Sequence, residues 1–353
     1  MKVGLITANP GHPVLVAVTR LLTPEHEVVH LDPEHEVVCL GPEREEVVRL
    51  GPEREEVRLG PEGACHGPAD VYLLKARTPR ALALAARLEE SGARVINSAA
   101  ATARCQDRVE MAERARAAGL PFARTLAVMT PRELAAAGEP PVPLVIKSRN
   151  SRRHDLVARA DGAVRLRELA ADWPEEPVVV QEFTANSGWD HKLWVVAGRL
   201  FAGLRRSELS PEGRGGTLPL PVAELPAAWV EAVLRVGEVF ELDVYGVDVL
   251  DAGGGAPLIV DINAFPGIRG QAGAPEALAE LALSTAMRNG GSRTAMGDGG
   301  SRTAMSDGGS RTAMGDGGSR TAMGDGGIRT AKRDGGIRTA MRDEGKVSEV
   351  AWR

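Results

Sequence analysis

Residues 258–270 read LIVDINAFPGIRG, an apolar stretch that an acid and an amide interrupt two positions apart. The apolar residues predict a β-strand over Leu258–Ile262. Because side chains alternate across a strand, Asp261 and Asn263 would share one face. Burying such groups without a partner is unfavourable, so this face is predicted to meet an ion.

A second acid, Asp248, lies on the apolar strand expected over Val247–Leu250. The segment 251–257, DAGGGAP, predicts a hairpin loop that lays the two strands side by side. Three oxygen ligands would then meet, and Mg²⁺ takes one or two carboxylates together with phosphate oxygens and water. A local alternative remains, in which Asp261 caps the following turn and Asn263 forms an Asx turn before Pro266.

Two further segments supply what a nucleotide would need. Lys147 ends the apolar strand Leu144–Lys147 and offers a cation for phosphates; alternatively it is an edge lysine that limits aggregation. The strand Val178–Phe183 offers backbone groups to an adenine edge, and Phe183 with the neighbouring valines could sandwich the ring. The alternative is a core strand that ends in polar residues.

The composition fits a protein of two or three domains that is not built for nucleic acid. The chain has 353 residues, 26% of them charged, and a formal net charge of −5, which gives no general attraction to nucleic acid or anionic membranes. No apolar run reaches the roughly 18 residues of a membrane span, and Met1–Ile6 shows no signal-peptide pattern, so we expect a cytoplasmic protein. The three cysteines, Cys39, Cys65 and Cys105, are odd in number and lack metal-ligand spacing, and we expect free thiols.

Two internal repeats lie outside the expected fold. A unit of nine or ten residues recurs from Leu22, and GGSRTAMGD recurs with small changes from Gly290 to Asp343. The second resembles calcium-binding β-roll repeats only in length, because Arg293 and Ala295 replace the required glycine and aspartate, so a disordered tail is predicted. The expected division is a parallel α/β domain over 1–97 with a repeat insertion at about 22–66, a main domain over 98–286, and the tail over 287–353.

Strand and helix patterns predict an α+β architecture. The first part alternates strands and helices and so predicts a small parallel sheet: strands Val3–Ala8, Asp70–Lys75 and Val95–Asn97, helices Pro13–Leu22 and Pro79–Glu90. The later part carries many strands joined by short turns, which predicts antiparallel pairing. Its further expected elements are strands Lys192–Val196 and Leu200–Leu204 and helices Gln106–Ala118 and Ala227–Leu242, the last with an apolar stripe of Trp229, Val233, Val236 and Phe240.

Taken in order, these motifs resemble the ATP-grasp superfamily, and in particular the RimK-type peptide (α-L-glutamate) ligases. The motifs that carry the resemblance are Lys147, QEF at 181–183, Asp190-His-Lys192, Arg205-Arg206, Asp248 and DINAFPG at 261–267. The resemblance covers about residues 1–285 without the repeats.

The resemblance implies an ATP-grasp fold, with ATP clasped between two α+β lobes that follow a small parallel α/β domain. It places Lys147 on the phosphates, Glu182 and Phe183 on the adenine and Asp190 on the ribose. It further assigns Gln181 and Arg108 to the nucleotide, and Asp248, Asp261 and Asn263 to Mg²⁺ or Mn²⁺.

The resemblance also implies a carboxylate–amine ligase. A substrate carboxylate would attack the γ-phosphate, and an amine would then take the acyl phosphate, so the partners are an amino acid and a carboxylate-bearing peptide, protein or small molecule. Arg205 or Arg206, together with Lys192, is the candidate for stabilising the transferred group. The alternative for the arginine pair is a solvated strand end.

Two departures keep other functions open. The stretch 148–155, SRNSRRHD, lacks the glycines that usually cover the nucleotide, although Arg149, Arg152 and Arg153 could supply charge instead. The family's usual Arg–Asn element after the arginine pair is also absent. The pattern is similar as well to inositol trisphosphate kinases of the same superfamily, where Lys75 and the basic loop would bind substrate phosphates. A nucleotide-binding module without turnover is the third reading.

Overall fold

The structure is a computed structural model that describes residues 1–34, 46–50, 55–59, 68–210, 213 and 215–295. Cys39 and Cys65, much of the first repeat and residues 296–353 of the predicted tail lie outside the described residues. Cys105 is a free, buried thiol.

The N-terminal part is a parallel sheet with helices against it, as the sequence predicts. Its strands are β1 (Lys2–Ile6), β2 (Glu27–Leu31), β5 (Val71–Leu74) and β6 (Val95–Ile96), in the spatial order β2-β1-β5-β6. The helices α1 (Pro13–Leu22) and α2 (Pro79–Glu90) have the predicted limits. Each begins with a proline, whose missing N–H costs nothing in the first helical turn. The first repeat copy supplies β2, and later copies supply an antiparallel pair, β3 (Glu46–Leu50) and β4 (Glu55–Leu59).

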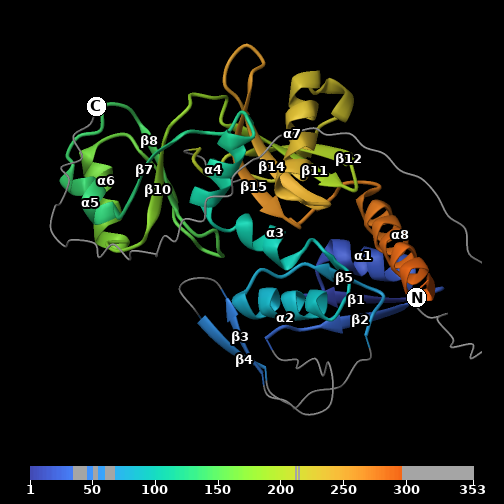
Figure 1. Cartoon of the computed structure of the whole chain (residues 1–353). Helices are drawn as coiled ribbons and strands as arrows, with labels where there is room; N and C mark the ends of the chain where they lie inside the picture. Colours follow the sequence, from blue (N-terminus) through green and yellow to red (C-terminus); the bar gives the residue numbers. More distant parts are fainter. Residues whose placement is uncertain (35–45, 51–54, 60–67, 211–212, 214, 296–353) are drawn as a thin grey trace, which may run out of the picture.

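The second part is an antiparallel sheet covered by two short helices (Figure 1). The strands β7 (Thr125–Met129), β8 (Leu144–Ser148), β9 (Val157–Ala160) and β10 (Val178–Glu182) have the order β7-β10-β8-β9. The helices α5 (Pro131–Ala136) and α6 (Ala163–Asp172) bury Leu134, Leu166 and Leu169 against the sheet. These helices, β7 and β9 were not predicted.

The third part is a larger antiparallel sheet. The strands β11 (Trp189–Val196), β12 (Arg199–Arg206), β13 (Thr217–Pro219), β14 (Val244–Asp251) and β15 (Pro257–Ala264) have the order β13-β12-β11-β14-β15. The helices α4 (Arg108–Ala117) and α7 (Ala227–Phe240) share one hydrophobic core with this sheet, and the short helices α3 (Ala99–Arg104) and η1 (Val222–Glu224) complete the connections. The predicted stripe of α7 is fully inside that core, which confirms its orientation.

A β-bulge shifts the pairing between β14 and β15. Asp248 pairs with Asp261, but the next residue, Val249, pairs with Ile259. Val260 is therefore the extra residue on β15, and an extra residue of this kind loses its place in the ladder. The shift decides which side chains of β15 share a face with Asp248.

The last helix, α8 (Ala274–Ala295), returns to the N-terminal part. It packs against α1 and against the end of the third sheet, in a core that includes Trp194, Phe265 and Leu278. No helix was predicted for these residues. It continues through position 287, where the tail was expected to begin, so the first residues of the second repeat are helical.

Candidate functional site

One row of side chains crosses three neighbouring strands of the third sheet. Lys192 on β11 lies opposite Asp248 on β14, and Asp248 lies opposite Asp261 on β15. Residues directly opposite each other on antiparallel strands share a face, and like charges in such positions repel. Two carboxylates side by side therefore require positive charge close by.

Lys192 supplies part of that charge. Its Nζ lies 2.5 Å from Asp248 Oδ2 and 3.2 Å from Asp190 Oδ2, and its side chain is almost fully buried. Burial raises the pKa of Asp248, and the nearby Lys192 opposes that rise. The lysine thus bridges two acids that the resemblance assigns to different tasks, one to the metal and one to the ribose.

Lys147 approaches the same row from the second sheet. Its strand, β8, pairs with β10 on one side and β9 on the other, so the alternative of an edge lysine is wrong. Lys147 Nζ donates a 2.8 Å hydrogen bond to the carbonyl of Val260, the bulged residue. Burial lowers the pKa of Lys147, while Asp261 opposes the shift. The bulge therefore both turns Asp261 into the row and provides an acceptor for Lys147.

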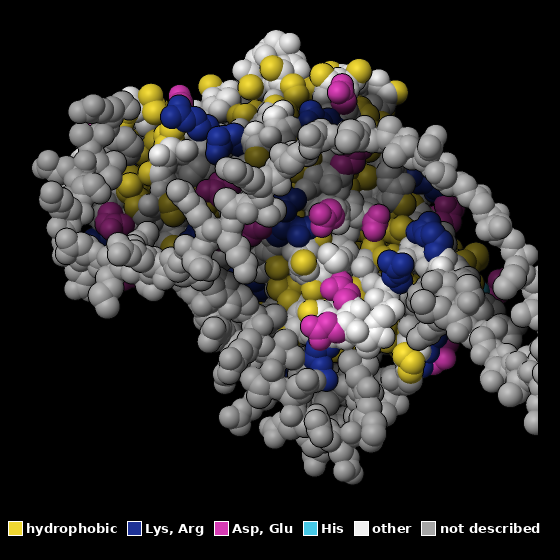
Figure 2. All heavy atoms as spheres, in the orientation of Figure 1, with side chains coloured by type: hydrophobic (Ala, Val, Ile, Leu, Met, Phe, Trp, Pro, Cys, Tyr) yellow, Lys and Arg dark blue, Asp and Glu magenta, His cyan; other side chains and the backbone are white. Residues whose placement is uncertain are grey.

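The two antiparallel sheets enclose a space that we call the inter-sheet cleft, with an empty volume of about 680 Å³. Figure 2 shows acidic and basic side chains intermixed across the centre of the molecule. The cleft is lined by Arg108, Lys147, Gln181, Glu182, Phe183, Asp190, Lys192, Asp248 and Asp261, together with Val145, Val157, Leu250, Leu258 and others. All predicted nucleotide residues line it.

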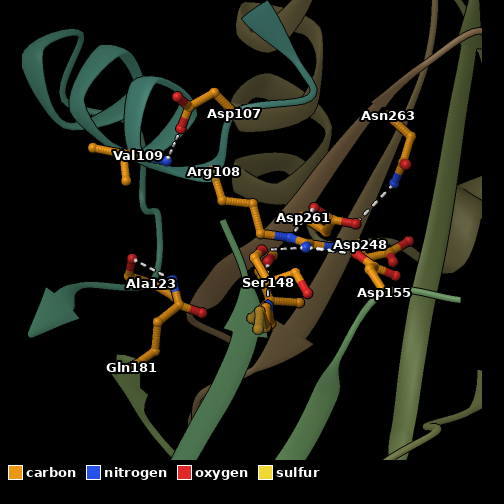
Figure 3. Close-up of polar contacts among 12 residues, drawn as sticks. Asp107, Arg108, Val109, Ala123, Ser148, Asp155, Gln181, Asp248, Asp261 and Asn263 are labelled. Atoms are coloured by element: carbon orange, nitrogen blue, oxygen red, sulfur yellow. Dashed lines mark hydrogen bonds and ion pairs between the residues drawn. The ribbon is translucent and has the colours of Figure 1, made fainter. Parts of the chain in front are cut away.

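Arg108 reaches into the middle of this group from the start of α4 (Figure 3). Its Nη1 donates to Ser148 O and to Asp155 Oδ2, each at 2.7 Å, and its Nε lies 3.9 Å from Asp261 Oδ1. The guanidinium thereby ties the end of β8 and the following loop to the acid of β15. This places Arg108 at the cleft by geometry, where the sequence offered only the resemblance.

One end of the cleft is apolar. Val145 and Val157 come from the second sheet, and Leu250 and Leu258, which pair across β14 and β15, come from the third. Phe183 begins the connection between the sheets, and the Arg159 guanidinium stacks on its ring at 3.9 Å. Gln181 is buried and donates to the carbonyl of Ala123 at 3.3 Å, whereas Glu182 is exposed. Two apolar walls and an aromatic ring suit a flat heterocycle.

The arginine pair splits between two environments. Because neighbouring residues of a strand face opposite ways, only one can face the row. Arg205 pairs with Asp190 in register and lines a second cleft beside Lys192, whereas the Arg206 guanidinium lies 5.5 Å from the Trp189 ring. Of the two candidates, the geometry favours Arg205.

Two arginines of the glycine-free loop 149–156 form ion pairs with acids outside the cleft. Arg149 forms a bidentate contact with Asp107, with its closest distance at 2.7 Å, and Arg152 pairs with Glu176 at 2.7 Å. None of these loop residues lines the inter-sheet cleft within the described parts of the chain. The idea that Arg149 and Arg152 replace the missing glycines with charge therefore finds no support in this conformation.

The predicted metal ligands form a weak but suitable donor set. Asn263 donates to Asp261 Oδ2 at 3.0 Å, so its amide lies beside the acid pair. Among the described residues, no group of three or more His, Cys, Asp or Glu side chains is placed to hold an ion. Two carboxylates and one amide oxygen suit Mg²⁺, whose remaining ligands are usually water molecules and phosphate oxygens.

Sequence reasoning missed several residues of the site. Arg77, after β5, donates to Asn263 Oδ1 at 3.3 Å, and Arg269 follows the FPG turn. The signal for Arg77 was the KAR tripeptide at the carboxyl end of a parallel strand, where ligands of α/β sheets gather. Asp155 carried no signal, because its partner Arg108 is 47 residues away.

Comparison of the fold identifies its class. No family model and no curated protein matches the sequence. A RimK-domain ATP-grasp protein from Sphaerobacter thermophilus superposes with a TM-score of 0.60 at 20% identity, covering 80% of this chain and 100% of that one. D-alanine–D-alanine ligase from Bacillus anthracis, complexed with ATP, gives 0.56 at 14% identity, covering 83% and 99%. The ligase PsnB, complexed with a minimal precursor, Mg and ADP, gives 0.52 at 18%, covering 81% and 97%.

The chain has the ATP-grasp fold, as the sequence predicted, and it resembles RimK-type proteins among others of that fold. The second and third sheets are the two lobes of the clasp, and the parallel sheet precedes them. No helix in the described residues is long and apolar enough to cross a membrane. Similarity at this level of identity concerns the fold, so the activity is argued from the site.

Proposed function

We propose that the chain is an ATP- and Mg²⁺-dependent carboxylate–amine ligase that works through an acyl phosphate. The observation that carries this is the row Lys192–Asp248–Asp261 facing Lys147 across one cleft. Cations and paired acids around one space suit a triphosphate with its divalent ion. The solved ligases of this fold that bind ATP, or Mg and ADP, support the assignment.

In this proposal the apolar end of the cleft holds the adenine between Val145 and Leu250, beside Phe183. Asp190 lies beyond it for the ribose, and Lys147 and Arg108 hold phosphate oxygens. Asp248, Asp261 and Asn263 would hold Mg²⁺ or Mn²⁺, which offsets phosphate charge when bound. Lys147 would keep its contact with Val260 while it binds the nucleotide.

The reaction then proceeds in two displacements. A carboxylate oxygen of the acceptor attacks the γ-phosphorus, and ADP leaves with the bonding electron pair. The amine of the second substrate attacks the acyl carbon, and inorganic phosphate leaves as an amide forms. In this proposal Lys192 and Arg205 stabilise the transferred phosphoryl group and the tetrahedral oxyanion.

The test is release of phosphate from Mg-ATP by the purified full chain with mixtures of amino acids and peptides. We expect release that requires both a carboxylate and an amine, with mass spectrometry showing an amide product. Turnover with a polyol phosphate alone, yielding a phosphorylated product, would make the protein a kinase. A shift in melting temperature with ATP but no turnover would make it a binding module.

A further inference from the structure

A second cleft adjoins the first and differs from it in charge. We call it the cationic cleft; its empty volume is about 1760 Å³, and it shares Lys192 and Asp248 with the inter-sheet cleft. It lies between the parallel domain and the third sheet. Its charged lining residues are Lys75, Arg77, Lys192, Arg205, Arg269 and Asp248.

Part of the positive charge of this cleft is unpaired among the described residues. The single acid among its described lining residues, Asp248, is already engaged by Lys192. No ion pair joins Lys75, Arg77 or Arg269 to a carboxylate in the part of the chain that the structure describes. The Arg77 guanidinium donates to the amide oxygen of Asn263.

The three cations come from two connections and act on one another. Lys75 directly follows β5, Arg77 lies in the connection from β5 to α2, and Arg269 lies between β15 and α8. Burial lowers the pKa of Lys75 to about 8, with further lowering from Arg77 and Arg269. Its Nζ lies 5.6 Å from the Phe265 ring. Holding like charges together in a partly buried place is unfavourable unless an anion joins them.

A buried histidine lies behind the same group. His12 occupies the N-cap position of α1 without a side-chain capping bond, is 7% exposed, and has no hydrogen-bond partner for its Nδ1 among the described residues. Its Nε2 lies 3.1 Å from where a Cβ on Gly267 would stand, so the FPG turn packs directly on it. Burial and the charges of Lys75 and Arg269 lower the pKa of His12 to about 4, so the ring is neutral at neutral pH. The neutral ring of His12 therefore does not offset the positive charge of Lys75, Arg77 and Arg269.

Given the proposed ligase function, we propose that the acceptor carries a dianionic group besides its reacting carboxylate, and that Lys75, Arg77 and Arg269 bind this group. A phosphate monoester or a closely spaced pair of carboxylates has this chemistry. Cations that converge from two connections, one after β5 and one after β15, can each meet a different oxygen, and guanidinium groups suit both anions. The shared Lys192 and Asp248 place the reacting carboxylate next to the γ-phosphate.

The experiment measures binding of probes to the full chain by calorimetry, with Mg²⁺ and a non-hydrolysable ATP analogue filling the inter-sheet cleft. Phosphoserine is compared with serine, and tricarballylate with butyrate. We expect phosphoserine to bind 10-fold or more tightly than serine, or tricarballylate 10-fold or more tightly than butyrate. The double variant Lys75→Met/Arg269→Gln should lose at least 10-fold of that affinity while nucleotide affinity changes less than 2-fold.

The matched control is Arg132→Gln/Arg165→Gln, which removes the same charge from exposed positions on α5 and α6; it should bind the probes as the wild type does. Phosphoserine binding points to a phosphate monoester, and tricarballylate binding to paired carboxylates. The inference fails if neither probe is preferred by the wild type, a result that needs no folded variant, or if both double variants bind equally. Failure of the ATP analogue to bind would instead refute the proposed function, and probe binding without nucleotide would still report on the cationic cleft.

Discussion

The two clefts share Lys192 and Asp248, but they differ in whether their cations are paired with oxygens of the protein. The inter-sheet cleft pairs each of its main cations with a protein oxygen: Lys147 with Val260, Lys192 with Asp248, and Arg108 with Asp155. The cationic cleft leaves Lys75 and Arg269 without a carboxylate among the described residues. A balanced cleft can accept a ligand that brings its own counter-ion, such as Mg-ATP, whereas an unbalanced cleft requires the ligand itself to carry the negative charge.

The largest effect should come from removing an acidic side chain of the inter-sheet cleft. Asp261→Asn keeps the shape of the side chain and removes the charge opposite Asp248, and with it the main anionic pair for the divalent ion. We expect kcat for phosphate release to fall about 100- to 1,000-fold under saturating ATP, with an unchanged melting temperature.

Asp161→Asn is the matched control, because this exposed acid contacts Arg159 near the start of α6. A variant at Asp261 that retains most of the wild-type turnover would remove the metal assignment. Titration with Mn²⁺ in place of Mg²⁺ would show whether residual activity needs more metal, as a weakened site should.

The bulge shows how far the sequence could predict this site. Regular pairing from the hairpin loop sets Leu250 opposite Leu258 and would continue with Val260 opposite Asp248, leaving Asp261 on the other face. The prediction that Asp248 and Asp261 lie together agrees with the structure only because one residue is inserted. The sequence signal for the bulge was the pair Ile259 and Ile262, which are three residues apart and would face opposite ways in a regular strand. In the structure both side chains are fully buried in the core that includes α7.

Other parts were accessible from local pattern or not at all. The limits of α1 and α2 followed from helix-start prolines and apolar spacing, and the α7 stripe from period alone. By contrast, the anchoring of the loop after β8 depends on Arg149 meeting Asp107, 42 residues earlier. The buried stripe of α8 consists mainly of alanines, among them Ala274, Ala277 and Ala282, and its burial is set by contacts with α1 from the other end of the chain. Pairings of this range are properties of the folded chain.

Deleting Val260 should give an intermediate effect and test the bulge itself. The deletion restores a regular ladder in which Asp261 still faces Asp248, but it removes the carbonyl that accepts from Lys147. Because β15 is an edge strand, we expect the chain to fold. Loss of one charge-assisted hydrogen bond, roughly 1.5–3 kcal/mol, should weaken binding of an ATP analogue about 10-fold or more through a misplaced Lys147.

Calorimetry with the ATP analogue provides the measurement, and circular dichroism confirms the fold. Lys147→Met serves as the reference, because its loss of affinity should be at least as large. If the deletion binds nucleotide as tightly as the wild type, the Val260 carbonyl has no part in positioning the lysine. Probe binding in the cationic cleft should be unaffected in both variants, which separates the two clefts.

The smallest expected effect is on the pH dependence of stability, through His12 beside the cationic cleft. The pKa of His12 is lowered to about 4 in the folded chain from its ordinary 6.5, so between these values the unfolded chain binds more protons. Stability must then rise with pH across about 4 to 6.5 and fall as the pH drops toward 4. His12→Gln should flatten this part of the profile, retaining on the order of 1–2 kcal/mol more stability at pH 4.5 than the wild type, or a few degrees in melting temperature. Melting curves at pH 4.5, 5.5 and 7.5 check this, with His154→Gln in the exposed loop after β8 as control. An equal slope in the wild type and His12→Gln would mean that neither burial nor the charges of Lys75 and Arg269 lower the pKa of His12 in the folded chain.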